Sequence, residues 1–332
     1  MNTIKLPDTT ECTIAVIGLG YVGLPLAIEF AKNKDCLSKK LFKRKVIGFD
    51  INLERLESLK NCIDSTKELK KDDFKYLKKI NLTNDNKVIS KANVFIVTVP
   101  TPIDQRNNPC LKALKNASQI VGEAIRLKNK NDIKPIIVFE STVYPGATEE
   151  VCIPIIEKVS NLNLNKDFFC GFSPERINPG DNKNKLDSII KVTSGSNKTS
   201  AIWIDNFYKS IIKVGTHLTS NIKVAETAKV IENTQRDLNI ALMNELSKIC
   251  HLAQIDTIEV INAAATKWNF LDFRPGLVGG HCVGVDPYYL IDRSKTYKYL
   301  PKILLSARKI NEDVPKNITQ NVNKIVKGNS NT

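Results

Sequence analysis

The first two thirds of the chain alternate short, almost wholly apolar runs with segments that have helical spacing. The apolar runs are rich in Ile, Val and Phe, and they predict strands at residues 12–18, 45–50, 93–99, 134–140, 168–173, 189–193 and, as a further candidate, 211–215. Strands that are apolar on both faces are typical of a parallel sheet covered by helices. We therefore predict a Rossmann-like, doubly wound α/β domain over residues 1–215.

Beyond this domain the pattern becomes helical throughout. Residues 221–255 contain no Pro or Gly, and their apolar positions recur at helical spacing, at Val224, Ala228, Ile231, Leu238, Leu242, Leu246 and Ile249. This pattern predicts one long helix. The expected later elements are a shorter helix at 256–265, a Gly- and Pro-rich loop at 269–287 and a final helix at about 301–327. We therefore predict an all-helical domain over residues 216–312.

Composition and charge narrow the classes of protein that fit. The 332 residues carry a formal net charge of +14, but Lys is mixed with acidic residues and no aromatic interleaving accompanies it. We expect a solvated basic surface that also suits an anionic small substrate, and no nucleic-acid partner. The chain has no run of about eighteen apolar residues and no apolar signal-peptide core, so we expect no membrane segment. Scattered cysteines without CxxC pairs predict a reduced, cytoplasmic protein without a metal site.

The first apolar run leads directly into a glycine-rich segment. Gly18, Gly20 and Gly23 form the pattern GxGxxG, and a helix is expected after it. In a dinucleotide-binding turn the first glycine permits the tight bend, the second admits the pyrophosphate, and the third lets helix and strand pack closely. The second predicted strand ends at Asp50, whose carboxylate would bind a ribose 2′-hydroxyl and favour NAD over NADP. We therefore predict NAD as the cofactor.

Unusual residues follow three of the predicted strands. The runs "VFIVTV", "IIVFE" and "FFCGF" lead into "PTPID", "STVYPG" and "SPERINPGD". Ligands of an open parallel sheet bind outside the carboxyl ends of its strands, whereas Pro and Ser also occur there simply because they terminate strands. The residues that we expect to rim one crevice are Thr101, Ser141, Thr142, Glu175 and Arg176.

Two further patterns point to chemistry in the helical part. Lys229, Asn233 and Arg236 or Asp237 lie on one side of the long helix, which is either a solvated face or a functional one. The segment "GLVGGHCVGVD" places Cys282 between two glycine-rich arms. Glycines let backbone or a ligand come close, so a cysteine with so little bulk around it is a candidate for reaction.

Together these segments resemble the nucleotide-sugar 6-dehydrogenases, the family of UDP-glucose, GDP-mannose and UDP-N-acetylhexosamine dehydrogenases. The matching stretches are "VIGLGYVGLPLA", "VTVPTPI", "ESTVYPGATEE", "SPERINPGD", "KVAETAKVIENTQRDLNIALMNELS" and "KWNFLDFRPGLVGGHCVGVDPYYL", and they span residues 12–312. "SPERINPGD" and "FRPGLVGGHC" look most like the branch acting on UDP-N-acetylhexosamines, UDP-GlcNAc or UDP-GalNAc, for capsule or O-antigen polysaccharide. The resemblance implies a four-electron oxidation of the sugar C6 alcohol to a carboxylate with two NAD.

The resemblance also implies roles for individual residues. Cys282 would attack the C6 aldehyde as a thiolate, giving a thiohemiacetal and then a thioester that water releases. Lys229 would stabilise the oxyanion at C6. Asn233 would help to fix that oxygen or an ordered water, and Asp286 would orient Lys229 or the water and share the base role. Thr142 and Glu175 would contact the nicotinamide end and the hydrolytic water.

The assignments can be stated as three sets. The catalytic residues are Cys282, Lys229, Asn233, Asp286, Glu175 and Thr142. The cofactor-binding residues are Gly18, Gly20, Tyr21, Val22, Gly23, Asp50, Arg55, Pro100, Thr101, Ser141, Thr142 and Glu175. The substrate-binding residues are Arg176, Lys229, Asn233, Arg236, Arg274 and Gly279.

The chain departs from the family pattern in two places. Relatives that oxidise UDP-glucose carry a second Glu four residues after the one matching Glu175, and this chain has Pro179 there. Family members also continue into a third, nucleotide-binding domain, so we interpret residues 313–332 as the start of a linker to a domain that this sequence lacks. The family builds a homodimer through the long helix, and we expect the same here.

Other functions remain open at this point. One is a truncated, non-catalytic paralogue that binds NAD without turnover. Another is a one-step alcohol or hydroxy-acid dehydrogenase, which would leave the thiol at Cys282 without a role. Within the family, UDP-glucose, UDP-ManNAc and GDP-mannose are alternative substrates.

Overall fold

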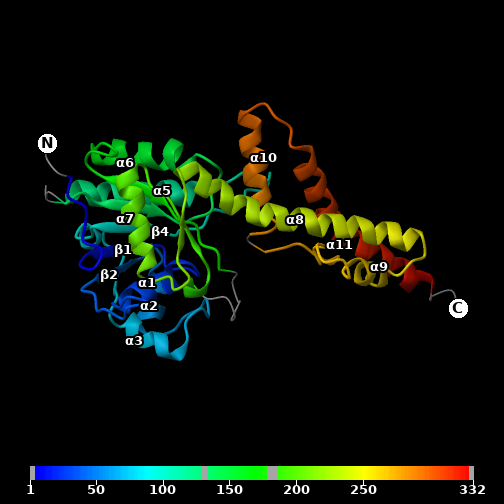
Figure 1. The fold of residues 1–332 in the computed structure, drawn as a ribbon, viewed down its shortest axis with the longest axis horizontal. Helices are drawn as coiled ribbons and strands as arrows, with labels where there is room; N and C mark the ends of the chain where they lie inside the picture. The colour runs from blue at the N-terminus through cyan, green and yellow to red at the C-terminus, as the bar shows by residue number, and fades with distance from the viewer. Residues whose placement is uncertain (1–3, 129–132, 178–185, 281, 329–332) are drawn as a thin grey trace. The chain divides into compact units, whose positions relative to one another are not determined.

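The computed structural model describes residues 4–128, 133–177, 186–280 and 282–328 (Figure 1). The chain divides into two compact units. The first unit comprises residues Met1–Thr101 and Cys110–Lys229, and the second comprises Pro102–Pro109 and Val230–Thr332. The expected domain boundary at residue 216 stays a prediction.

The first unit is built on a six-stranded sheet in which every pair of neighbouring strands is parallel. In chain order its strands are β1 (Thr13–Ile17), β2 (Lys45–Phe49), β3 (Asn81–Thr83), β4 (Val94–Val97), β5 (Ile136–Phe139) and β6 (Phe169–Phe172). The spatial order is β3-β2-β1-β4-β5-β6, which is the doubly wound order and confirms the Rossmann-like α/β prediction. The order reverses between β1 and β4, so a ligand is expected outside the carboxyl ends of these two strands.

Helices connect these strands and bury the sheet. They are α1 (Gly23–Ala31), α2 (Leu53–Lys60), α3 (Phe74–Leu77), α4 (Asn86–Ile89), α5 (Lys112–Leu127), α6 (Ile153–Ser160) and α7 (Lys198–Lys209), with short 3₁₀ turns η1 (Lys71–Asp73) and η3 (Leu186–Ser188) and a π-helical turn η2 (Thr148–Cys152). All residues of β4, β5 and β6 are buried, as their apolar sequences predict. Stacked rings of Phe30, Trp203 and Phe207 join α1 to α7.

The strand predicted at residues 211–215 is wrong. These residues form a turn after α7, in which Ile211 and Ile212 are buried in the core. The strand β8 (Thr216–Leu218) begins only at residue 216, and it pairs with β7 (Lys191–Thr193) in a separate two-stranded sheet. A short run of β-branched residues therefore marked a buried turn here, because burial and strand formation leave the same apolar signal.

Four helices make up most of the rest of the chain. They are α8 (Ile222–Leu252), α9 (Thr257–Ala264), α10 (Asp286–Thr296) and α11 (Lys302–Gly328). The prediction of one long helix is confirmed by α8, which begins in the first unit and continues into the second. The described part of the second unit is helix or loop, apart from an isolated bridge between Ile103 and Pro109. None of the described helices is long and apolar enough to cross a membrane.

The buried face of α8 differs from the one that its apolar pattern suggests. Val224, Ile231, Leu242 and Ile249 are between 44% and 58% exposed. The buried positions mix apolar residues with polar ones, namely Ile222, Ala225, Glu226, Lys229, Val230, Asn233, Thr234, Asp237, Ala241, Met243, Asn244 and Cys250. The helical period was therefore predicted correctly, but a large part of its apolar stripe faces solvent in this chain.

Candidate active site

The glycine-rich turn after β1 has the geometry of a phosphate-binding turn. Gly18 has a φ of +94° and donates its N–H to the carbonyl of Phe49 on β2 at 2.8 Å. A Cβ at Gly23 would lie 1.9 Å from the Gly18 carbonyl oxygen and 2.3 Å from the hydroxyl of Thr98. At Gly20, by contrast, no described heavy atom lies within 4 Å of an added Cβ, so the backbone there is open to a close ligand.

The helix that follows the turn is suited to an anion. Its N-cap, Val22, provides no side-chain hydrogen bond, and α1 begins at Gly23 without an acidic residue in its first turn. The first N–H groups of a helix lack partners within the helix, and with the helix dipole they attract phosphate. The turn and this helix end therefore fit the pyrophosphate of NAD, with Tyr21 and Val22 lying in the turn itself.

Asp50 ties the end of β2 to the glycine turn. One carboxylate oxygen accepts the N–H of Leu19 at 2.8 Å, and the other accepts the N–H of Asn52 at 2.9 Å. Arg55, from the first turn of α2, donates its Nε–H to the Leu19 carbonyl at 3.0 Å. Asp50 and Arg55 thus hold successive backbone groups of the same turn, and each oxygen of Asp50 keeps a lone pair for a ribose hydroxyl.

The loops after β4 and β5 are joined by side-chain hydrogen bonds. Thr101 Oγ1 donates to the Thr142 carbonyl at 2.6 Å, and Ser141 Oγ donates to the Val99 carbonyl at 2.6 Å. Pro100 lies exposed between the two joined positions on its loop. The structure therefore brings Thr101, Ser141 and Thr142 together at the carboxyl end of the sheet, and their contact with a cofactor stays a prediction.

Glu175, after β6, is held by the backbone and by a buried lysine. Its Oε1 accepts the N–H groups of Arg176 at 2.6 Å and Ile177 at 2.8 Å. Its Oε2 lies 3.5 Å from Nζ of Lys191, which also forms an ion pair with Glu140. The carboxylate is therefore fixed in orientation, as a group that positions a water or a nicotinamide must be.

The ionic cluster behind Glu175 was not predicted from the sequence. Glu140, Lys191 and Tyr208 are buried, and the Tyr208 hydroxyl donates to Glu140. Burial raises the pKa of Glu140. Burial alone would lower the pKa of Lys191, but the charges of Glu140 and Glu175 outweigh it and raise that pKa. Charged residues inside the apolar runs "IIVFE" and "IIKVT" were the available signal.

Arg176 donates Nη1–H to the Ile190 carbonyl at 2.9 Å, which ties the start of its loop to the segment before β7. Its predicted contact with the substrate is untested by this geometry. Pro179, which replaces the second Glu of UDP-glucose relatives, lies outside the described residues.

The side of α8 that carries Lys229 and Asn233 is buried and hydrogen-bonded. Lys229 and Asn233 lie one turn apart, and both are buried. Asn233 Nδ2 donates to Asp286 at 2.6 Å, and Arg236 Nη1 donates to Asn233 Oδ1 at 3.1 Å. Lys229 and Asn233 therefore do not lie on a solvated face, whereas Arg236 is partly exposed, and a functional role for this side of the helix stays a prediction.

Cys282 lies just before the first turn of α10. The N–H groups of Val285 and Asp286 donate to its carbonyl at 3.1 and 2.8 Å, and Asp286 is the first residue of the helix. The cysteine is half-buried, so the residue does not lie in the fully buried core. At Gly279 and Gly280 no described heavy atom lies within 4 Å of an added Cβ, so the backbone is open at these two positions, and the lack of bulk around the thiol itself stays a prediction.

Side-chain amides that the sequence analysis did not predict anchor the glycine-rich segment before Cys282. Asn244 on α8 donates to the Gly276 carbonyl at 3.0 Å and accepts the Gly276 N–H at 2.8 Å. The same amide donates to Asn311 at 2.8 Å, and Asn311 in turn donates to Asp237 at 2.7 Å. Asp237 also forms a buried ion pair with Arg308 at 2.7 Å. The polar residues on the buried face of α8 therefore fix the start of the loop.

Arg274 binds a neighbouring residue of its loop and a residue of α9. It forms an ion pair with Asp272 at 2.7 Å and donates to Asn262 at 2.8 Å. Its contact with a substrate stays a prediction.

The parallel sheet, the glycine turn and Asp50 define a Rossmann-type dehydrogenase that binds a nicotinamide dinucleotide. Comparison with known proteins agrees. The model for the NAD binding domain of the UDP-glucose/GDP-mannose dehydrogenase family matches residues 12–213, and the model for the central domain of that family matches residues 223–313. The chain belongs to the UDP-glucose/GDP-mannose dehydrogenase family, and its cofactor is NAD.

Individual relatives are similar over almost the whole chain. UDP-N-acetyl-D-glucosamine 6-dehydrogenase of Pseudomonas aeruginosa is 53% identical over 302 residues, which cover 91% of this chain and 68% of that protein. Protein CapL of Staphylococcus aureus is 50% identical and is covered to 69%. Among solved structures, UDP-D-ManNAc dehydrogenase from Pyrococcus horikoshii superposes with a TM-score of 0.82 at 30% identity, covering 96% of this chain and 72% of that one.

Proposed function

We propose that this chain oxidises the C6 hydroxyl of a UDP-N-acetylhexosamine, UDP-GlcNAc or UDP-GalNAc, to the carboxylate, in the synthesis of a capsule or O-antigen polysaccharide. The single observation that carries the proposal is the position of Cys282, which is a half-buried cysteine in a glycine-rich loop with an open backbone. The nearby hydrogen bond from Asn233 to Asp286 supports it, because it ties that loop to α8. Relatives at 50–53% identity named as UDP-N-acetyl-D-glucosamine 6-dehydrogenases favour this sugar over UDP-glucose, UDP-ManNAc or GDP-mannose.

In the proposed mechanism the thiol retains the substrate between the two oxidations. NAD, held at the glycine turn and Asp50, would supply the hydride acceptor for both oxidations at C6, so two NAD would be reduced per sugar. After the first oxidation, Cys282 adds to the aldehyde carbon, forming a carbon–sulfur bond while the carbonyl oxygen takes up a proton. The second oxidation leaves a thioester at Cys282. Water then displaces the sulfur, which releases the acid and regenerates the thiol.

The other residues stabilise charge and place water. Lys229 supplies a positive charge for the oxyanion that forms at C6 during thiol addition and hydrolysis. Asp286 is oriented by the amide of Asn233 and accepts a proton from the sugar hydroxyl or from the attacking water. Glu175, fixed by two backbone N–H groups, holds the hydrolytic water. Thr142, with its carbonyl bound by Thr101, lines the nicotinamide end.

The stoichiometry of NADH tests this proposal. The full chain is incubated with excess NAD and a limiting amount of UDP-GlcNAc or UDP-GalNAc, and absorbance at 340 nm is followed to its end point. Two NADH per sugar are expected. Cys282→Ser should form no acid, whereas Cys110→Ser, which removes another half-buried thiol, should behave as the unsubstituted chain. If the unsubstituted chain and Cys282→Ser both form one NADH per sugar, the chain is a one-step dehydrogenase. NAD binding without turnover would indicate a non-catalytic paralogue.

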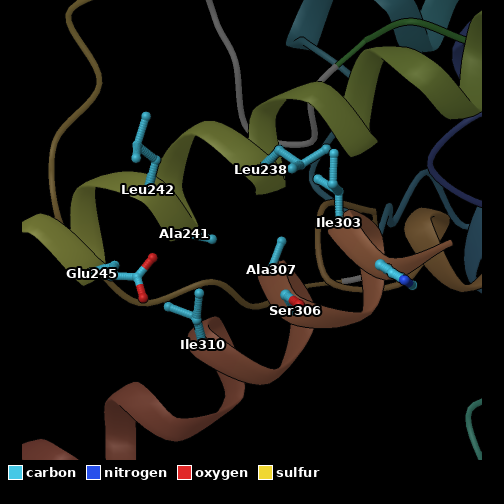
Figure 2. A pocket seen from close by; sticks show the side chains of 9 residues that line it. Leu238, Ala241, Leu242, Glu245, Ile303, Ser306, Ala307 and Ile310 are labelled. Atoms are coloured by element: carbon cyan, nitrogen blue, oxygen red, sulfur yellow. The ribbon is translucent and has the colours of Figure 1, made fainter.

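We also propose that the chain forms a homodimer through α8. Support comes from its exposed apolar side chains and from a groove of about 290 Å³ between α8 and α11 (Figure 2). The groove is lined by Leu238, Ala241, Leu242, Glu245, Lys302, Ile303, Ser306, Ala307 and Ile310. Contiguous apolar surface of this kind marks protein–protein contacts. Sedimentation should give twice the chain mass, and Leu242→Lys should give a monomer. Leu41→Lys, a control at an exposed leucine of the first unit, should not.

We place the protein in the cytoplasm, where NAD and nucleotide sugars are both present. All eight cysteines lie in the described part of the chain and none is in a disulfide, which suits a reducing compartment.

A further inference from the structure

Arg55 lies beside the place where cofactor choice is made in Rossmann domains. An acidic residue at the end of the second strand, here Asp50, binds the ribose 2′-hydroxyl of NAD, and a nearby Arg binds the 2′-phosphate of NADP in the domains that use it. This chain has both residues, because Arg55 follows Asp50 by five positions on α2. A chain that uses NAD must therefore prevent Arg55 from binding the 2′-phosphate of NADP.

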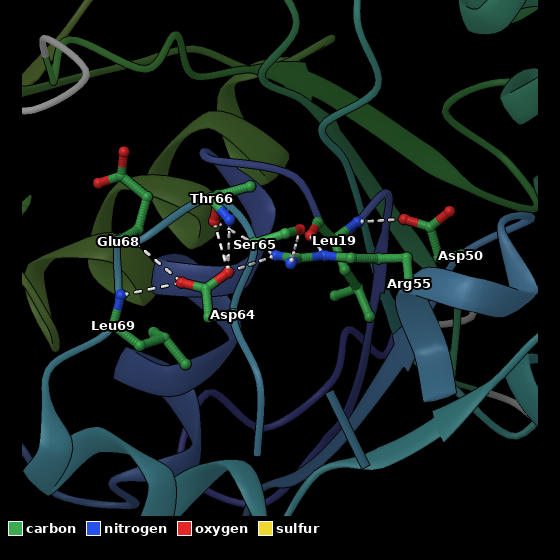
Figure 3. Close-up of polar contacts among 8 residues, drawn as sticks. All are labelled: Leu19, Asp50, Arg55, Asp64, Ser65, Thr66, Glu68 and Leu69. Atoms are coloured by element: carbon green, nitrogen blue, oxygen red, sulfur yellow. Dashed lines mark hydrogen bonds and ion pairs between the residues drawn. The ribbon is translucent and has the colours of Figure 1, made fainter. Parts of the chain in front are cut away.

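The structure shows that the guanidinium of Arg55 is occupied by the protein itself (Figure 3). Its Nε–H donates to the Leu19 carbonyl at 3.0 Å, Nη1 donates to Ser65 Oγ at 2.9 Å, and Nη2 donates to Thr66 Oγ1 at 3.3 Å. Nη2 also lies 2.9 Å from Oδ1 of Asp64. The side chains of Arg55 and Asp64 are only 9% and 3% exposed, so this ion pair is shielded from water.

Asp64 is fixed as firmly as its partner. Its Oδ1 accepts the N–H of Thr66 at 3.0 Å and the hydroxyl of Thr66 at 2.6 Å, and its Oδ2 accepts the N–H groups of Glu68 at 2.9 Å and Leu69 at 3.1 Å. Burial raises the pKa of Asp64, but the hydrogen bonds from Thr66, Leu69 and Arg55 outweigh burial and leave that pKa below its usual value. The carboxylate is therefore charged at neutral pH and folds the segment 64–69 around itself.

We propose that Asp64 is a specificity-determining residue, which excludes NADP by holding the charge and the N–H groups of Arg55 on the protein. With Asp64 in place, Arg55 hydrogen-bonds to the glycine turn at Leu19 and has little charge and few N–H groups left for a 2′-phosphate. The negative charge of Asp50 also repels that phosphate. Without the Asp64 carboxylate, the positive charge of Arg55 is no longer neutralised by an ion pair and can bind a phosphate near the turn. The inference rests on the proposed function only in that the chain binds a nicotinamide dinucleotide.

Binding titrations test the proposal without relying on turnover. The full chain and its variants are titrated with NADH and NADPH, and the dissociation constants are read from nicotinamide fluorescence. In Asp64→Asn the ratio of NADPH to NADH affinity should rise about ten- to a hundredfold, the range contributed by one charge-assisted hydrogen bond to an anion. Asp64→Ala should give the same direction. The affinity ratio is insensitive to the fraction of folded protein, because that fraction scales both titrations equally.

Three control variants separate charge release from other effects. Glu68→Gln removes a carboxylate from the same segment that points away from Arg55 in Figure 3, so its affinity ratio should stay unchanged. Asp64→Glu keeps the negative charge and should also keep the ratio. Arg55→Gln in the Asp64→Asn background should abolish the gain in NADPH affinity, because the gain is assigned to the guanidinium.

The outcomes divide clearly. A ratio that is unchanged in both Asp64→Asn and Asp64→Ala, or a gain that survives in the double variant, overturns the role of Asp64. An equal loss of NADH and NADPH affinity also overturns it, because it makes Asp64 a purely structural residue. If the unsubstituted chain binds neither nucleotide, the proposed function fails as well, and that result is distinct from an unchanged ratio.

Discussion

Replacing Gly23 by alanine should destabilise the fold and weaken cofactor binding together. The added Cβ would lie 1.9 Å from the Gly18 carbonyl oxygen and 2.3 Å from Thr98 Oγ1, whereas real contacts of a Cβ essentially never fall below 3.0 Å. The nearer obstacle is backbone, so α1 must move about 1 Å away from the turn. Overpacking of this kind costs about 3 kcal/mol at the upper end of the usual range, because the nearer neighbour is a backbone carbonyl and cannot rotate aside.

The matched substitution Gly20→Ala should separate the two effects. No described heavy atom lies within 4 Å of its Cβ, so the free energy of unfolding should change by less than about 0.5 kcal/mol. Its methyl group would nevertheless occupy the space that the pyrophosphate needs, and NADH affinity should fall about tenfold or more. Gly23→Ala should lose affinity as well as stability, because the N-terminus of α1 is displaced.

Urea unfolding followed by circular dichroism and NADH fluorescence titration measure the two quantities on the same samples. The reasoning is refuted if Gly23→Ala is as stable as the unsubstituted chain. It is also refuted if Gly20→Ala loses as much stability as Gly23→Ala does.

Two further predictions concern buried polar groups. Glu226 accepts the N–H groups of Gly146 and Thr148, and burial raises its pKa to about 7. The stability that the protonated Glu226 contributes is fully present below pH 4.5 and is lost as the pH rises through 7. Between pH 4.5 and 8 the free energy of unfolding in urea should therefore fall by about 3 kcal/mol more for the unsubstituted chain than for Glu226→Gln. Equal pH profiles of the two proteins would contradict this. Asn244→Leu removes the two hydrogen bonds to Gly276 and the hydrogen bond to the buried Asn311, which should cost about 2 kcal/mol. The freed loop should speed the alkylation of Cys282 by iodoacetamide, and an unchanged alkylation rate would speak against the anchoring role.

Local patterns were sufficient for the elements whose signal is continuous. The runs that became β4 and β5 are apolar at every position, and the glycine spacing located the turn before α1. The strand β3 was missed because its three residues, Asn81–Thr83, are largely polar, and its place in the sheet comes only from pairing with β2. Short edge strands carry too few residues for a periodic signal.

In the candidate site, the sequence predicted individual reactive residues but not the contacts between them. Cys282 and Asp286 were selected from one segment, but the contact of Asp286 with Asn233 joins positions 53 residues apart in sequence. The ion pair of Lys191 with Glu140 likewise spans 51 residues. Such pairs depend on how the chain returns to itself, which hydrophobic periodicity does not encode. For the same reason the apolar pattern of α8 did not reveal which of its faces is buried.

Central to this account is a covalent bond between the Cys282 sulfur and C6 of the sugar during the second oxidation. Rapid mixing of the chain with NAD and UDP-GlcNAc or UDP-GalNAc, acid quenching and intact-protein mass spectrometry measure that bond directly. The account predicts a transient increase in chain mass that corresponds to the thioester-linked nucleotide sugar, located on the peptide containing Cys282 and absent from Cys282→Ser. Formation of the uronic acid by Cys282→Ser at an undiminished rate, with no adduct on either chain, would contradict it.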